Sequence, residues 1–121
     1  MRQAALALGH MLLGGVFVWA GAEHFLRFKA MTAELAAKRI PVPSAALAAG
    51  SALELTAGLC LALGVLRVYA AAALILFTIA ATVMLVDFWR YSGAERQALR
   101  SVFLLNVATI GGLLIAASGA A

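Results

Sequence analysis

One carboxylate lies well inside an otherwise apolar stretch of this sequence. Glu54 stands in the segment Gly50–Gly64, GSALELTAGLCLALG, in which no other side chain carries a charge. A charged side chain at the centre of a membrane-spanning helix costs about 2.5–3.5 kcal/mol on insertion scales, so such residues face the interior of a bundle and have a partner. Glu54 is therefore the first candidate for chemistry.

Two interpretations of Glu54 remain open from the residues alone. In the structural one, a protonated carboxyl is hydrogen-bonded to Asn106 or to a threonine and only holds helices together. In the functional one, Glu54 accepts a proton or polarises a ligand in a pocket, for example through a hydrogen bond to a quinone carbonyl or head group.

Further polar side chains are expected at the same end of the molecule as Glu54. Glu54 and Asn106 each lie seven residues into their predicted helices, and both helices begin after loops assigned to one side. At 1.5 Å per residue, both lie roughly 10 Å below that surface. The two other helices end on this side. The candidate ligand-binding residues are Glu54, Asn106, His24, Glu23, Asp87 and Trp89.

Small residues share the predicted packing stripes with these polar groups. A stripe with a four-residue repeat contains Gly50, Glu54, Gly58 and Ala62. Such residues lie on one helix face, where small side chains permit close helix approach. A stripe with 4-3-4-3 spacing contains His10, Gly14, Phe17, Gly21 and His24.

The two histidines are expected to differ in role, because they lie at opposite ends of this second stripe. His24 can point along the interior seam towards Glu54. His10 is expected to hydrogen-bond a neighbouring helix or to extend its ring towards the membrane surface.

The elements that must position these residues are membrane-spanning helices. Of the 121 residues, 65% are hydrophobic and 12% are charged, whereas soluble domains are about 45–50% apolar. Open strands would leave backbone groups unsatisfied in lipid, and the alternating pattern of a barrel is absent. We expect one all-α domain, residues 1–121, an integral membrane four-helix bundle with helices at about 4–22, 47–66, 68–86 and 99–118.

The connections predict further structure. Residues 25–39 have the pattern of a short amphipathic helix lying in the interface, although an irregular loop with apolar anchors remains an alternative. Pro41 and Pro43 cannot continue that helix, and Ser44 is the expected N-cap of the next one. The connection around residues 65–68 is so short that the helices on either side must form an antiparallel hairpin.

Charge predicts the orientation of the bundle. The net charge is +4, and seven of the nine Lys and Arg residues fall in the first and third loops. The positive-inside rule places these loops in the cytoplasm, so the basic character indicates membrane topology and not nucleic-acid binding. Arg2, the apolar stretch after it and Ala20-Gly21-Ala22 resemble a secretory signal, but we expect this segment to remain as the first span.

Several other chemistries are not expected. The lone Cys60 excludes an internal disulfide and is expected to be a small buried apolar residue. His10 and His24 stand at opposite ends of one helix, which argues against a metal site or a bis-histidine haem. No nucleotide-binding or nucleophile motif is present. We expect no metal and no intrinsic cofactor, and the sequence identifies no catalytic residue.

The chain resembles the DoxX family of small membrane proteins. The similarity rests on a succession of segments that covers nearly the whole chain: GAEHFLRF, AAKRIPVPSAALAAG, LELTAGLCLALG, VDFW and LLNVATIGGLLI. The resemblance implies a four-helix protein of the bacterial cytoplasmic (inner) membrane, associated with quinone-linked redox systems or with complexes that handle oxidative or thiol stress. Glu54, Asn106 and His24-Phe25 match residues that the family carries at the corresponding positions. Relatives often carry a lysine where this chain has Leu105, and a histidine where it has Val86.

Three functional hypotheses follow. The leading one is a membrane subunit that supports a quinone-linked redox complex, or binds a quinone or other lipophilic ligand near Glu54. On this hypothesis the chain does not catalyse a reaction by itself. The second is a purely structural partner that contacts lipid and another subunit or a second copy. The third is a small proton-coupled exporter, although the chain lacks the discontinuous spans of many transporter sites.

Overall fold

The computed structural model describes residues 1–118, and within that range the regular elements are all helical. Four of the helices are long and apolar enough to cross a membrane, the third of them when it is counted through Arg90. This confirms the predicted all-α membrane bundle. In chain order the elements are α1 (Arg2–Leu26), α2 (Phe28–Ala37), α3 (Pro43–Leu63), α4 (Arg67–Leu85), η1 (Phe88–Arg90) and α5 (Gly93–Ala117).

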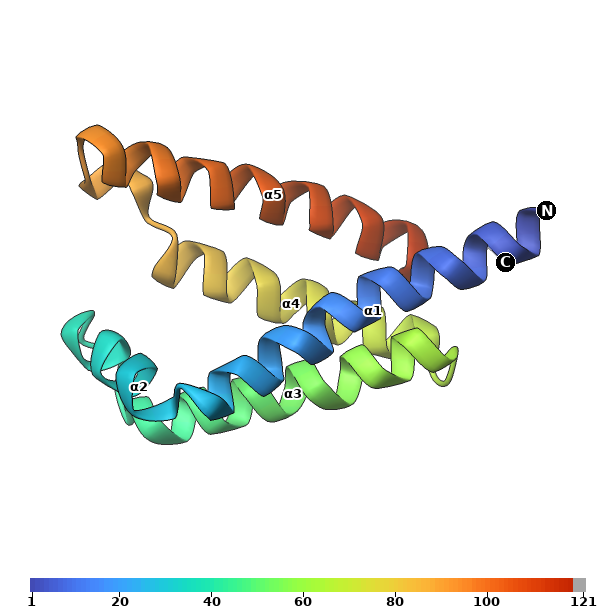
Figure 1. Cartoon of the computed structure of the whole chain (residues 1–121), viewed down its shortest axis with the longest axis horizontal. Helices are drawn as coiled ribbons and strands as arrows, with labels where there is room; N and C mark the ends of the chain where they lie inside the picture. The colour runs from blue at the N-terminus through green and yellow to red at the C-terminus, as the bar shows by residue number, and fades with distance from the viewer. Residues whose placement is uncertain (119–121) are drawn as a thin grey trace.

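A bend at Arg27 separates α2 from α1 without breaking the backbone hydrogen bonding. Arg27 N donates to Glu23 O (2.9 Å), and Met31 N donates to Arg27 O (3.0 Å). The chain changes direction here, so α2 points away from α1 at one end of the bundle (Figure 1). Its buried residue is Leu35, and the short helix packs against α3.

The start of α3 differs from the prediction that Ser44 is its N-cap. Val42 occupies the cap position in a left-handed conformation with φ 47°, and no side chain caps the helix. Pro43 is the first helical residue. Proline suits this position because its missing N–H would have no partner in the first turn and because its φ is already helical. The helix therefore begins one residue before Ser44.

A tight turn joins α3 to α4 and makes them the expected antiparallel hairpin. Gly64 adopts φ 76° and ends α3, and Leu66 follows with φ 49° immediately before α4. Val65 N donates to Cys60 O at 2.8 Å, which satisfies a carbonyl at the helix end.

Backbone contact between α1 and α3 makes this the closest pair in the bundle. A methyl group added at Gly14 would overlap the carbonyl oxygen of Gly58 and the backbone of Ala62, and one added at Gly21 would lie 2.9 Å from Ser51 O. Gly14, Gly21 and Gly58 therefore permit the two helices to approach closely, as predicted for the small residues of the two stripes. Gly50 does not belong to this contact, because it faces Phe77 of α4.

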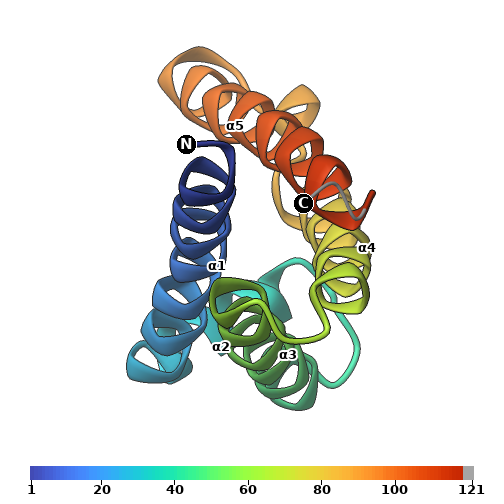
Figure 2. The ribbon, with the colours of Figure 1, turned by 90° about the vertical axis from the view of Figure 1, so that its right-hand side faces the viewer.

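Viewed nearly end-on, the four long helices follow one another around a ring in the order α1, α3, α4, α5 (Figure 2). Phe17, Leu61, Leu74 and Leu113 form a buried apolar core with small alanines from α3, α4 and α5. The ring is least tightly joined where α1 meets α5. Both α2 and η1 lie at the end of the bundle opposite the N-terminus (Figure 1).

Candidate functional site

A cavity of about 450 Å³ lies between the helices at the end of the bundle that carries α2. Residues from α1, α2, α3, α4 and α5 line it, and most of its wall is apolar. This size and lining are typical of pockets for small lipophilic ligands. The polar side chains in the lining are His24, Glu34, Lys38, Ser51, Glu54, Thr78, Asn106 and Thr109.

His24 and Glu54 meet in this wall from two different helices. His24 Nδ1 of α1 lies 2.8 Å from Glu54 Oε1 of α3, and Glu54 is only 3% exposed. Two bare lone pairs would repel at this distance, so a proton lies between the two atoms. The contact lacks the alignment of an ordinary hydrogen bond, and neither atom has another partner within residues 1–118. The pair is therefore close enough to share a proton.

Two buried hydroxyls lie in the same wall. Ser51 is 1% exposed and Thr78 is 5% exposed, and neither hydroxyl has a hydrogen-bond partner among the described residues. Buried polar groups are almost always hydrogen-bonded, and leaving one unpaired costs about 1–3 kcal/mol. Both hydroxyls lie in the same cavity wall as the His24–Glu54 contact. The wall is therefore built to bond something that occupies the cavity.

Asn106 lines the cavity, but it is not the partner of Glu54. Its amide nitrogen donates to Thr82 Oγ1 at 2.9 Å, which joins α5 to α4. Of the two interpretations, the structural one named Asn106 or a threonine as the partner of Glu54, but the α1–α3 contact brings His24 to Glu54 while Asn106 lies across the ring on α5. Equal depth in two helices does not place two side chains face to face.

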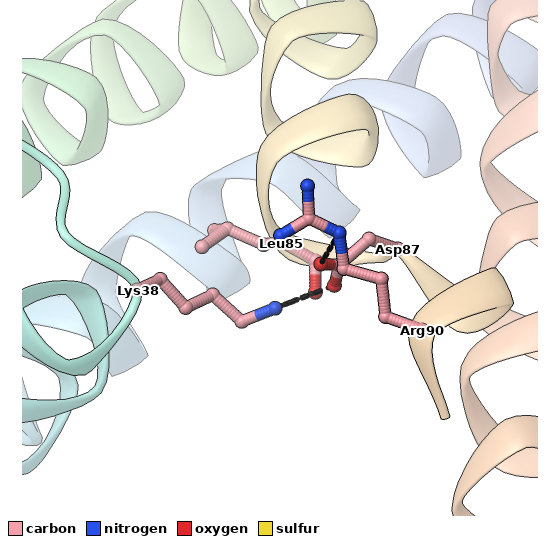
Figure 3. A network of polar contacts seen from close by, with 4 residues as sticks. All are labelled: Lys38, Leu85, Asp87 and Arg90. Carbon is pink, nitrogen blue, oxygen red and sulfur yellow. Dashed lines mark hydrogen bonds and ion pairs between the residues drawn. The ribbon is translucent and has the colours of Figure 1, made fainter. Parts of the chain in front are cut away.

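An ion-pair cluster ties the short helix α2 to the end of α4 beside the cavity. Lys38 Nζ contacts Asp87 Oδ1 at 2.5 Å and Leu85 O at 3.4 Å, and Arg90 Nε lies 3.7 Å from Asp87 Oδ2 (Figure 3). Burial of the ammonium group opposes its charge, but the hydrogen bond to Asp87 and the proximity of Tyr91 outweigh this and raise the pKa of Lys38. Lys38 itself belongs to the cavity lining.

Three of the predicted site residues lie outside the cavity lining. Glu23 is exposed and bonded within α1, where Trp19 Nε1 donates to it at 3.2 Å. Asp87 is held by Lys38 and Arg90. Trp89 packs edge-on against Phe88, with ring centroids 5.4 Å apart. The other three candidates, Glu54, His24 and Asn106, are brought together by the fold.

Sequence reasoning did not select Ser51, Thr78 and Lys38 as site residues. Ser51 lies three positions before Glu54, so helical periodicity places both on one face and could have identified it. Thr78 gave no such signal, because serine and threonine are common in membrane helices as packing residues. The role of Lys38 depends on Asp87, which comes from a different loop and has no local sequence relation to it.

His10 also departs from expectation. It is 8% exposed, so its ring does not extend to the surface, and no residue in the described range forms a hydrogen bond or ion pair with it. The reason is that α5, the helix across from it, presents glycine, alanine and aliphatic side chains here.

The sequence profile of the family described as DoxX matches residues 5–87. This range contains His24, Ser51, Glu54, Thr78 and Asp87, and it ends before α5. The searches of curated proteins and of solved structures return no match.

Proposed function

Because this chain belongs to the DoxX family and carries four membrane-spanning helices, we propose that it binds a lipophilic molecule with a polar head in the Glu54 cavity. In this role it supports a quinone-linked redox complex of the bacterial cytoplasmic membrane and has no catalysis of its own. The single observation that carries the proposal is that the buried hydroxyls of Ser51 and Thr78, which have no hydrogen-bond partner within residues 1–118, lie beside the His24–Glu54 contact on one cavity wall.

The chemistry of the wall suits a quinone head group. The hydroxyls of Ser51 and Thr78 can each donate to a carbonyl oxygen. His24 Nδ1 and Glu54 Oε1 lie 2.8 Å apart, so a proton shared by this pair can be given to a bound oxygen or taken back from it. A quinone supplies two-electron redox chemistry when it is bound. The surrounding apolar wall excludes water and accommodates the rest of the molecule.

A partner is part of this proposal, because α5 leaves large apolar side chains exposed. In α5 the buried residues are Leu113 and Ala116, and large apolar side chains such as Leu104, Leu105 and Ile115 are more than half exposed. We place a partner subunit or a second copy of the chain on this helix, with membrane lipid on the remaining faces.

Glu54→Gln tests the ligand-binding proposal. Titration of the chain in lipid nanodiscs with a decyl-substituted benzoquinone should give a dissociation constant about tenfold higher than that of the unchanged chain, because the amide cannot share a proton with His24 as the carboxyl does. The matched control is Glu23→Gln, which changes an exposed acid on α1 outside the cavity and should leave the affinity unchanged.

The same variant separates ligand binding from a purely structural role. Equal quinone affinity in the folded Glu54→Gln chain would exclude the cavity as the quinone site. Normal affinity together with loss of the assembled complex would instead favour the structural hypothesis.

A further inference from the structure

A second cavity of about 450 Å³ lies between α1 and α5, around His10. Gly9, His10 and Leu13 contribute from α1, and Gly112 and Ala116 contribute from α5. The small residues leave the space open, since a methyl group added at Gly9 would meet nothing within 4 Å. This is also the part of the ring where neighbouring helices are least tightly joined.

The imidazole of His10 is the polar feature of this cavity. The residue is more than nine-tenths buried, and its ring has no hydrogen-bond partner among residues 1–118. A neutral imidazole carries one donor and one acceptor. A molecule that occupies the cavity can bond this ring without displacing a contact within the protein.

We propose that this second cavity binds the head group of a neutral amphiphile, through a hydrogen bond between His10 and a hydroxyl or carbonyl of the ligand. None of the lining residues is charged, so an anionic phosphate or carboxylate head would be buried without a counterion, which is unfavourable. The cavity volume lies within the range of small-molecule sites. The head group can come from a neutral glycerolipid or from a quinone, which share this chemistry.

The His10 cavity is distinct from the Glu54 cavity, although the two adjoin at Val16, which lines both. His10 and His24 are separated by about 21 Å of helix at 1.5 Å per residue. The polar groups of the first cavity come from all five α-helices or their ends, whereas the second cavity lies between α1 and α5 alone. The proposal therefore stands or fails independently of the proposed function.

Histidine NMR on the full chain in nanodiscs tests the proposal directly, because the chain contains two histidines. With ¹⁵N-labelled histidine, glycerol monolaurate should shift the ring nitrogens of His10 and leave those of His24 in place. Dodecane, which lacks a head group, should leave both in place. Parallel titration with the decyl-substituted benzoquinone shows which neutral head group the site prefers, and a His10 shift with either probe supports the site.

Two variants test the same site by affinity. His10→Phe keeps a ring of similar shape and should weaken glycerol monolaurate binding roughly five- to tenfold through loss of one hydrogen bond. Gly9→Leu should block the cavity with His10 intact, which keeps the test valid if His10→Phe does not fold. Its matched control is Gly15→Leu, because Gly15 also has open space around it on α1 but does not line the cavity.

Three results would overturn the proposal. The first is a His10 resonance that neither probe moves. The second is equal affinity in the Gly9→Leu and Gly15→Leu variants. The third is loss of the His10 shift in Glu54→Gln, since one ligand would then span both cavities. Loss of quinone binding in Glu54→Gln with an unchanged His10 shift would support two separate sites.

Discussion

The chemistry available to Glu54 depends on the residue that faces it. Its carboxyl lies 2.8 Å from His24 Nδ1 and lines a cavity, so it differs from an acid bonded only to a neighbouring amide. Helical spacing placed Glu54 on a packing face and directed His24 towards it, because residues three and four apart share a helix face. It could not exclude Asn106 as the partner, since depth in a helix says nothing about its rotation.

Ser51→Ala is the sharpest test at this scale. Removing an unpartnered buried hydroxyl should raise the free energy of unfolding of the ligand-free chain by about 1 kcal/mol. It should also weaken quinone binding roughly fivefold, because one donor to the ligand is lost. Denaturant titration in detergent micelles and quinone titration in nanodiscs measure the two effects.

Ser101→Ala serves as the control for this substitution. Ser101 is exposed, and its hydroxyl already donates to Gln97 O at 3.1 Å. Ser101→Ala should therefore leave both the free energy of unfolding and the quinone affinity unchanged. A Ser51→Ala chain that is both less stable and unchanged in affinity would show that the hydroxyl has a structural partner.

At the scale of the element, α2 is a helix held in place by charge. Lys38 at its end contacts Asp87, which follows α4, and the contact fixes α2 beside the Glu54 cavity. The amphipathic pattern predicted a helix within residues 25–39, and the structure has one at Phe28–Ala37. The pattern could not reveal the ion pair, because its two members lie in different loops.

Lys38→Met should release α2 from the end of α4. We expect faster amide hydrogen exchange across Phe28–Ala37, measured by mass spectrometry, because the contacts to Asp87 and Leu85 are lost. Lys29→Met is the matched control, since Lys29 is an exposed lysine on the same helix. Equal exchange in the two variants would contradict a role for the ion pair.

The pH dependence of this contact has a definite sign. The pKa of Lys38 is raised above its usual 10.5 in the folded chain, so the folded state holds the proton more tightly than the unfolded state. The same contact lowers the pKa of Asp87 from its usual 3.8, so the pair is complete between pH 3.8 and pH 10.5, and it is lost as the pH rises through the folded-state pKa of Lys38 or falls through that of Asp87. Exchange in α2 of the unchanged chain should therefore approach that of Lys38→Met at strongly alkaline pH, after correction for the intrinsic exchange rate.

At the scale of the whole molecule, basic loops and the polar cavity share one end. The loop after α1 and the loop around η1 lie together there (Figure 1), joined by Lys38 and Asp87. Charge counting predicts that this end faces the cytoplasm. The Glu54 cavity would then lie in the cytoplasmic half of the membrane, and the His10 cavity in the opposite half.

Cysteine labelling tests this orientation. In a Cys60→Ser background, Ser92→Cys places a thiol beside η1, and Val65→Cys places one in the α3–α4 turn; both positions are exposed. A membrane-impermeant maleimide should label Val65→Cys in intact spheroplasts and Ser92→Cys only in inverted vesicles. The reverse pattern would invert the predicted orientation.

The sequence by itself determined the all-α membrane bundle, the α3–α4 hairpin and the inward position of Glu54. These follow from apolar run length, connection length and helical periodicity, which are local properties of the chain. Only the tertiary structure decided that α1 packs on α3 through Gly14 and Gly58, and therefore that His24 meets Glu54. It also decided that Glu23, Asp87 and Trp89 lie outside the cavity lining and that His10 has no hydrogen-bond partner within residues 1–118. These outcomes depend on which helices are neighbours and how each is rotated, and no single helix carries that information.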